Sequence, residues 1–313
     1  MVLAFTVSTF VYFSFGNIYS SKILNYVDFS GQFQSGVYQY RILSGYFLFW
    51  IYDFLSAFNI DYSIFKFKFL EPASEPKMYF SFYLLNTIFL VLSSAILLLI
   101  TETKNFVATQ TEKILLVSVA IFVIAFSQFV IVPYDVSSYF FLLIFFCFLL
   151  KYLDNNSTRN LAVLVLILLI STVNRESSAL SLSLAATLLF SKFGLRKETI
   201  LPISLLLITF IGVYFGLRMM SEKITTNDGN VFLQNFTDPK NIMGLLFWLT
   251  FLVFTLIIAR NQKTKGNIIF FHLFAIPYFI MCFYTGIIYE IRLYVPVFIT
   301  CLLLSRTDFS RLH

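Results

Sequence analysis

Charged residues set directly against apolar sequence are the ones in this chain that could do chemistry. They are Asp28, Arg41, Asp135, the neighbours Arg175 and Glu176, and the near neighbours Glu290 and Arg292. Guanidinium groups bind phosphate oxygens through paired N–H donors and stay charged. Carboxylates beside them suit the removal of a proton from a hydroxyl group, or the binding of a divalent metal ion that bridges phosphates. The set predicts a site for a phosphate-bearing substrate and leaves open whether a metal ion takes part.

Charges in such surroundings need partners. An ionised side chain at mid-membrane costs about 2.5–3.5 kcal/mol on the insertion scale. On a helix, Glu290 and Arg292 would point to different faces, so they are poorly placed to pair with each other. We therefore expect pairs between segments, Arg175 with Glu290 or Glu176 with Arg292. The alternative, that these charges are interfacial anchors or structural ion pairs, stays open.

Composition places the chain in a membrane. Hydrophobic residues make up 59% of it and charged residues 12%, against roughly 25% charged in soluble proteins. The 41 Phe and 18 Tyr, in long apolar runs, favour helices over a barrel. The net charge of +6 is spread over loops, so no nucleic acid partner is expected. We predict one integral membrane domain over residues 1–313.

The fold class that follows is all-α, a polytopic transmembrane helix bundle. A helix needs about 20 residues to cross about 30 Å of hydrocarbon, which predicts about ten spans. They lie near 2–20, 79–101, 114–132, 137–153, 160–173, 177–191, 200–217, 242–259, 268–289 and 291–305. The first span lacks the features of a signal peptide and is expected to be an anchor.

Loop charge predicts the orientation. Connections near 102–113, 151–160, 192–199 and 260–267, with the tail 306–313, hold twelve basic and five acidic residues, a net charge of 12 − 5 = +7. Basic connections stay in the cytoplasm, so both termini are expected there. Low charge and abundant Phe and Ile are typical of an AT-rich bacterial genome, so the expected location is the bacterial inner membrane. All the charges of the predicted site then lie on the outer side.

Two long outer segments are expected, 21–78 and 218–241. In the first, only 11 uncharged residues separate Arg41 from Asp53, too few for a comfortable span. Trp50 and several tyrosines suit the headgroup boundary, so this stretch is predicted to be a helix lying in the interface. The alternative is a true span over about 37–57, which would put the N-terminus outside.

Short spans predict a recess. The spans near 160–173 and 177–191 are too short to cross the hydrocarbon, so their outer ends must stop below the surface. Non-helical backbone at that depth is tolerated where it is buried in protein or lines a water-filled cavity. We expect Arg175 and Glu176 to line such a recess, with Asn174, Tyr134 and Tyr289 supporting them.

The arrangement resembles the GT-C-type glycosyltransferases, polytopic enzymes that use polyprenyl-phosphate-linked sugars on the outer face. The resemblance covers roughly residues 1–200 and is carried by one anchor span, by Asp28 in Tyr26-Val-Asp28-Phe-Ser30 soon after it, and by Asp135 between the third and fourth spans. It implies that Asp28 is the catalytic base, that Asp135 and Glu176 are supporting acids, and that Arg41, Arg175 and Arg292 hold the donor phosphate. The first loop has one acid where members of the family can have a pair.

The expected function is the transfer of a sugar from a polyprenyl-phosphate-linked donor to an acceptor in the assembly of cell-envelope polysaccharide or glycoconjugates. The expected partners are the lipid-linked donor and membrane lipid. A polysaccharide polymerase or ligase would show equally faint sequence features. A transporter or flippase of lipid-linked saccharide also stays open, although repeated halves with broken helices are not evident. A purely structural subunit is the remaining alternative.

Overall fold

The computed structural model describes residues 1–14, 22–35, 38–65, 67, 69–220 and 231–308. Within these ranges the secondary structure is helical, and extended pairing is limited to one isolated bridge between Phe106 and Thr307. The all-α prediction is therefore confirmed. Part of the expected span 2–20, part of the segment 218–241 and the end of the tail 306–313 lie outside the described residues.

Among the described residues, seven α-helices lie within positions 2–174. They are α1 (Val2–Ser14), α2 (Tyr26–Ser35), α3 (Ile42–Ser56), α4 (Pro76–Thr101), α5 (Gln110–Phe126), α6 (Asp135–Asp154) and α7 (Thr158–Asn174). The second half continues with α8 (Ala179–Phe193), α9 (Lys197–Met219), α10 (Phe232–Thr237), α11 (Pro239–Ile258), α12 (Gln262–Phe274), α13 (Ile276–Thr285) and α14 (Val295–Leu304). Short 3₁₀ turns lie between them: η1 (Lys22–Leu24), η2 (Tyr62–Phe65), η3 (Ser127–Phe129), η4 (Glu176–Ser178) and η5 (Ile291–Leu293).

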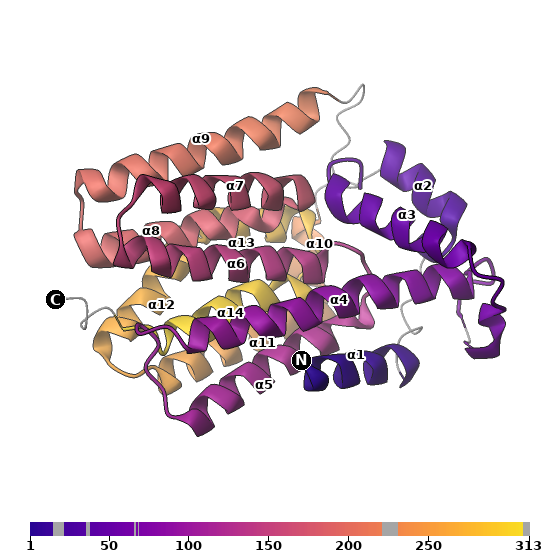
Figure 1. Cartoon of the computed structure of the whole chain (residues 1–313), viewed down its shortest axis with the longest axis horizontal. Helices are drawn as coiled ribbons and strands as arrows, with labels where there is room; N and C mark the ends of the chain where they lie inside the picture. The colour runs from indigo at the N-terminus through magenta and orange to yellow at the C-terminus, as the bar shows by residue number, and fades with distance from the viewer. Residues whose placement is uncertain (15–21, 36–37, 66, 68, 221–230, 309–313) are drawn as a thin grey trace.

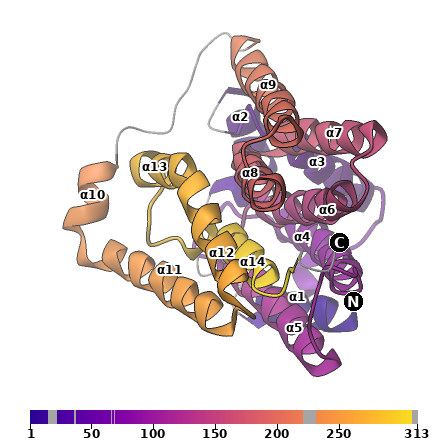
Figure 2. The ribbon, with the colours of Figure 1, turned by 90° about the vertical axis from the view of Figure 1, so that its left-hand side faces the viewer.

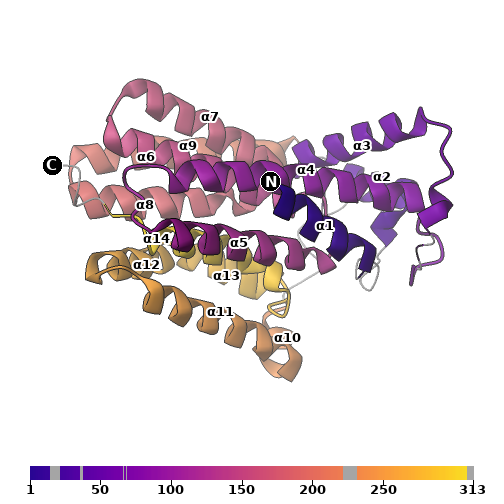
Figure 3. The same cartoon turned by 60° about the horizontal axis from the view of Figure 1, so that its bottom comes forward.

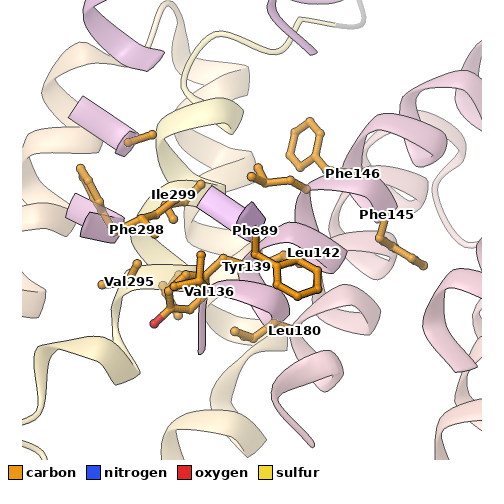
Figure 4. Close-up of a cluster of buried hydrophobic side chains, with 14 of the residues drawn as sticks. Phe89, Val136, Tyr139, Leu142, Phe145, Phe146, Leu180, Val295, Phe298 and Ile299 are labelled. Carbon is orange, nitrogen blue, oxygen red and sulfur yellow. The ribbon is translucent and has the colours of Figure 1, made fainter. Parts of the chain in front are cut away.

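The longer helices run side by side as a bundle, with α6 near its centre (Figure 1). Seen end-on, α9 and the pair α10 and α11 lie at the periphery (Figure 2). The inner helices α4, α6, α8 and α14 meet in a core of large side chains that includes Phe89, Tyr139, Leu180 and Phe298 (Figure 4). Val136, the residue after Asp135, and Val295, three residues after Arg292, belong to this same core. The core therefore fixes the backbone on either side of these two charged residues.

Five helices among the described residues are long and apolar enough to cross a membrane: α4, α5 with η3, α6, α9 and α11. The bent pair α12 and α13 makes a sixth if it is one span. This supports an integral membrane protein, but the prediction of about ten spans is not confirmed. The four other expected spans are found as shorter helices of 10–17 residues, α1, α7, α8 and α14. At 1.5 Å per residue each of them is shorter than the roughly 30 Å of hydrocarbon.

The two expected short spans are found as short helices. The chain forms α7 over 17 residues, where 160–173 was expected, and α8 over 15 residues, where 177–191 was expected. Ser157 caps the start of α7 by accepting a hydrogen bond from the backbone N–H of Asn160. Gly194, with φ +66°, ends α8 in a conformation that favours glycine. Local residues therefore determine where α7 begins and where α8 ends.

The basic connections gather at one end of the bundle. The backbone N–H of Val107 donates to Arg306, that of Arg260 to Ser305, and that of Asp308 to Asn105. These bonds join the α4–α5 connection, the α11–α12 connection and the segment after α14. The start of α6, the end of α7, and the helices α2 and α3 lie at the other end (Figures 1 and 3).

Helix α3 presents one face to the outside. Tyr46, Trp50 and Phe54, spaced four residues apart, are 62%, 76% and 62% exposed, while Leu48 and Leu55 on other faces are buried. Four residues are about one helical turn, so the three aromatic side chains form a continuous stripe. The helix packs against α4 and α7 and lies beyond the end of α7 (Figure 1).

Candidate functional site

A cavity of about 310 Å³ opens at the end of the bundle opposite the basic connections. Its walls come from α2, the start of α3, the α7–α8 connection, α13 and the segment before α14. Six residues expected to form the site line it: Arg41, Tyr134, Arg175, Glu176, Glu290 and Arg292. The structure thus brings together charges that are separated by up to 251 positions in the chain (292 − 41).

Irregular backbone carries most of these charges. Arg41 directly precedes α3, and Glu176 begins the turn η4. Arg175 has φ −166° and ψ 143°, an extended residue between the end of α7 and η4. An extended residue between two helical segments changes the direction of the chain, and here it turns the Arg175 side chain into the cavity. The short helix α7 thereby places a charge at the expected recess.

Asp135 joins two of the arginines. One carboxylate oxygen accepts a hydrogen bond from Nη1 of Arg175, and the other accepts from Nη1 of Arg292 at 3.2 Å. Asp135 is fully buried and itself does not line the cavity. Both of its oxygens are in ion pairs, so it is placed to hold the arginines rather than to accept a proton from a substrate.

Arg292 also pairs with Glu290, two residues before it in the chain. Nη2 and Nε of Arg292 lie 2.6 and 2.9 Å from Oε2 of Glu290. The predicted pairs Arg175 with Glu290 and Glu176 with Arg292 are therefore wrong. That prediction assumed a helix, in which residues two apart point to different faces. Glu290 is instead extended, with φ −74° and ψ 97°, and leads into the 3₁₀ turn η5.

Glu176 pairs with Arg41, a partner that was not expected. Nη2 and Nε of Arg41 donate to separate oxygens of Glu176 at 2.7 and 3.2 Å. Burial alone would raise the pKa of this carboxyl, but the attraction and hydrogen bonds of Arg41 outweigh it and lower the pKa to about 2. Glu176 is therefore ionised throughout the physiological range.

The ring of Tyr134 lies close to two guanidinium groups. The Cζ atom of Arg41 lies 4.3 Å from the centroid of its ring, and that of Arg175 lies 5.3 Å away. Tyr38 packs on the same ring at 5.3 Å between centroids. The π face attracts cations, so the ring lets two like charges approach the same cavity wall.

The arginines differ in the donors they have left. A guanidinium group has five N–H donors. Arg292 uses all three of its nitrogens on Asp135 and Glu290. Among the described residues, Arg175 donates through Nη1 alone and Arg41 through Nε and Nη2. Within the described residues, the nitrogens of these two side chains that make no hydrogen bond are Nε and Nη2 of Arg175 and Nη1 of Arg41; both side chains line the cavity and lie close to the ring of Tyr134.

Asn174 has a positioning role. Its side-chain oxygen accepts from the hydroxyls of Ser44 and Ser137, and its Nδ2 donates to Ser137 at 3.0 Å. Ser44 belongs to α3 and Ser137 to α6. Asn174 is fully buried, and its bonds fix the end of α7 against the two helices that begin with Arg41 and Asp135.

Four expected site residues do not line the cavity: Asp135 and Asn174, which lie behind its wall, and Tyr289 and Asp28. Tyr289 packs under Nζ of Lys240, 4.4 Å from the ring centroid. Asp28 is exposed on α2 and is not part of the lining. Gln32, four residues later on the same helix, does line it, and residues four apart share a helix face. Asp28 is therefore one turn beyond the cavity, and among the described residues its carboxylate is in no ion pair.

Residues that sequence reasoning missed hold the segment before α14. Asn235 donates from Nδ2 to the carbonyls of Phe283 and Gly286, at 2.9 and 2.7 Å, and accepts from the N–H of Ile288. The Asn235 side chain is fully buried, and its amide bonds this segment to α10. Gly244 allows close approach: a Cβ built there would collide with the carbonyl oxygen of Ile288.

In the described part of the chain, no group of three or more His, Cys, Asp or Glu side chains is placed to hold a metal ion. No known family model, curated protein or solved structure matches the chain. The physical arrangement of the cavity therefore carries the functional argument.

Proposed function

We propose that this protein is a membrane glycosyltransferase that moves a sugar from a polyprenyl-phosphate-linked donor to an acceptor at the outer face, in the assembly of cell-envelope polysaccharide or glycoconjugates. The observation that supports the proposal is the set of N–H donors that Arg175 and Arg41 leave unused at the cavity. Directed guanidinium donors match phosphate oxygens. The three arginines and three acids of the network sum to zero, so binding depends on donor geometry rather than on excess charge.

The roles follow from the contacts. Arg175 and Arg41 hold the donor phosphate over the ring of Tyr134. Asp135 positions Arg175 through their ion pair, and Arg292 in turn holds Asp135 and Glu290. An acceptor hydroxyl attacks the anomeric carbon, the bond from that carbon to the phosphate oxygen breaks, and polyprenyl phosphate leaves. Asp28 takes the hydroxyl proton, since it lies one turn from Gln32 of the cavity lining on α2 and its carboxylate is in no ion pair within the described residues.

The membrane arrangement completes the proposal. We infer about ten crossings, with the shorter helices crossing beside the longer ones, and both termini in the cytoplasm of a bacterial inner membrane. Helix α3 lies in the outer interface, where its exposed Tyr46, Trp50 and Phe54 suit the headgroup region. The lipid part of the donor would then lie beside the helices while its phosphate enters the cavity.

The test uses the purified protein in nanodiscs, supplied with polyprenyl-phosphate hexoses and candidate acceptors. Wild-type protein releases polyprenyl phosphate, Arg175→Gln and Asp28→Asn release it at least about 100-fold more slowly, and Lys263→Gln at the basic end matches wild type. Equal release by Asp28→Asn and wild type would remove Asp28 from the mechanism. Movement of intact donor across the bilayer of proteoliposomes, without release, would favour a transporter instead.

A further inference from the structure

The basic end of the bundle has a second cavity, separate from the proposed catalytic site. It has a volume of about 700 Å³ and lies between the end of α6, the start of α7 and the start of α9. Its lining comprises Tyr152, Asn156, Thr158, Leu161, Lys197, Glu198, Ile200, Leu201, Pro202 and Ser204. The volume falls within the range of about 300–1,000 Å³ typical of ligand sites.

The side chains that line this cavity change from charged to apolar along α9. Lys197 and Glu198 stand at the first turn of the helix, and Ile200, Leu201 and Pro202 follow. Ile200 and Leu201 are 56% and 68% exposed although they lie in a helix apolar enough to cross a membrane. The cavity is thus polar at its outer rim and, apart from Ser204, apolar toward the middle of the bundle, a polarity profile that matches a phospholipid.

The charge around the rim favours an anion. Lys197 lines the cavity, and Arg159 and Arg196 directly follow or precede lining residues in the sequence. All three are exposed, and none forms an ion pair within the described part of the chain. Glu198 is the one acid of the lining. The positive ends of the dipoles of α7 and α9 also lie here, because both helices begin at this end (Figure 1), and the negative end of α6 lies beside them.

We propose that this cavity binds one anionic phospholipid, with its phosphate at Lys197 and an acyl chain along Leu161, Ile200 and Leu201. Basic pockets between transmembrane helices at the cytoplasmic surface are suited to anionic headgroups. A free phosphate would use only the rim, whereas the apolar depth of the cavity needs a chain to fill it. The occupant is therefore a lipid of the surrounding leaflet.

The experiment is native mass spectrometry of the full chain released from mixed micelles that contain equal amounts of phosphatidylglycerol and phosphatidylcholine. Wild-type protein retains one phosphatidylglycerol in preference to phosphatidylcholine. Lys197→Gln lowers that retention about fivefold, and Leu201→Trp, which fills the apolar part, abolishes it. Glu198→Gln raises it. Lys263→Gln, which removes a lysine from the same end at the start of α12, leaves it unchanged.

Three outcomes would overturn the proposal: equal retention of the two lipids, no effect of Lys197→Gln beyond that of Lys263→Gln, or displacement of the lipid by millimolar glycerol 3-phosphate. The last result would identify a site for free phosphate instead. Thermal unfolding of each variant separates a lost site from a misfolded chain. The readout is independent of glycosyl transfer.

Discussion

The guanidinium carbon of Arg41 lies 4.3 Å from the centroid of the Tyr134 ring, and Arg175 shares that ring. The ring therefore makes cation–π contacts with two positively charged side chains. We predict that Tyr134→Leu weakens binding of a polyprenyl-phosphate sugar by about 2–30-fold, which is the equivalent of one cation–π contact of about 0.5–2 kcal/mol. Isothermal titration in nanodiscs measures the affinity.

The matched control is Tyr134→Phe, which keeps the ring and removes only the hydroxyl. It should bind the donor nearly as well as wild type. Equal losses in the Phe and Leu variants would show that the hydroxyl matters and the stacked ring does not.

Asp135→Asn tests the centre of the ion-pair network. The substitution leaves Arg175 and Arg292 without the charge that both contact, and breaking a buried pair costs about 3–5 kcal/mol. The thermal unfolding midpoint in detergent should fall markedly. Glu102→Gln, which breaks an exposed pair with Lys113 at the other end of the bundle, should cost about 1 kcal/mol or less. Similar shifts for the two variants would contradict the proposed role of Asp135.

Gly244→Ala tests the wall of the cavity. Because the added methyl group meets the carbonyl of Ile288, the segment that carries Glu290 and Arg292 must move, and both stability and donor binding should decrease. Gly212→Ala on α9 meets nothing within 4 Å and should be neutral or stabilising by about 0.5–1 kcal/mol. Calorimetry and donor titration of both variants check the difference, and unchanged donor binding in Gly244→Ala would count against a rigid wall.

Acid should weaken the Arg41–Glu176 pair only at low pH. The pKa of Glu176 is lowered to about 2 in the folded protein, whereas an unfolded Glu titrates near about 4.3. The stability that the pair contributes is therefore fully present above about pH 5 and is lost as the pH falls from there toward 2. The difference in unfolding midpoint between wild type and Glu176→Gln should be constant from pH 8 to 5 and shrink below it. A difference that already declines between pH 8 and 6 would contradict this assignment.

The sequence predicted where the charges meet better than it predicted their partners. Apolar run length and loop charge indicated that Arg175, Glu176 and Arg292 share one end of the bundle, and the short helices α7 and α8 agree with that. Partner choice depends on backbone conformation. The turn η5 lets Glu290 reach Arg292, and the position of α3 brings Arg41 to Glu176, neither of which run length can indicate.

The span count and the supporting residues were likewise beyond what apolar run length can predict. Hydropathy marks α1, α3 and α14 as apolar, but where each helix begins and ends depends on packing against neighbours far away in the chain. Asn235 and Gly244 hold the cavity wall through contacts with residues 283–288. Such long-range contacts leave no periodic pattern in the sequence.

The order of the six charges along the chain has a consequence for synthesis. As the ribosome proceeds, Arg41, Asp135, Arg175, Glu176, Glu290 and Arg292 appear in turn, so their running sum alternates between neutral and a single charge. The first four already form two ion pairs, Arg41 with Glu176 and Arg175 with Asp135. The last two arrive as a pair of their own. A nascent chain can thus bury its polar cavity in neutral steps as successive helices enter the membrane.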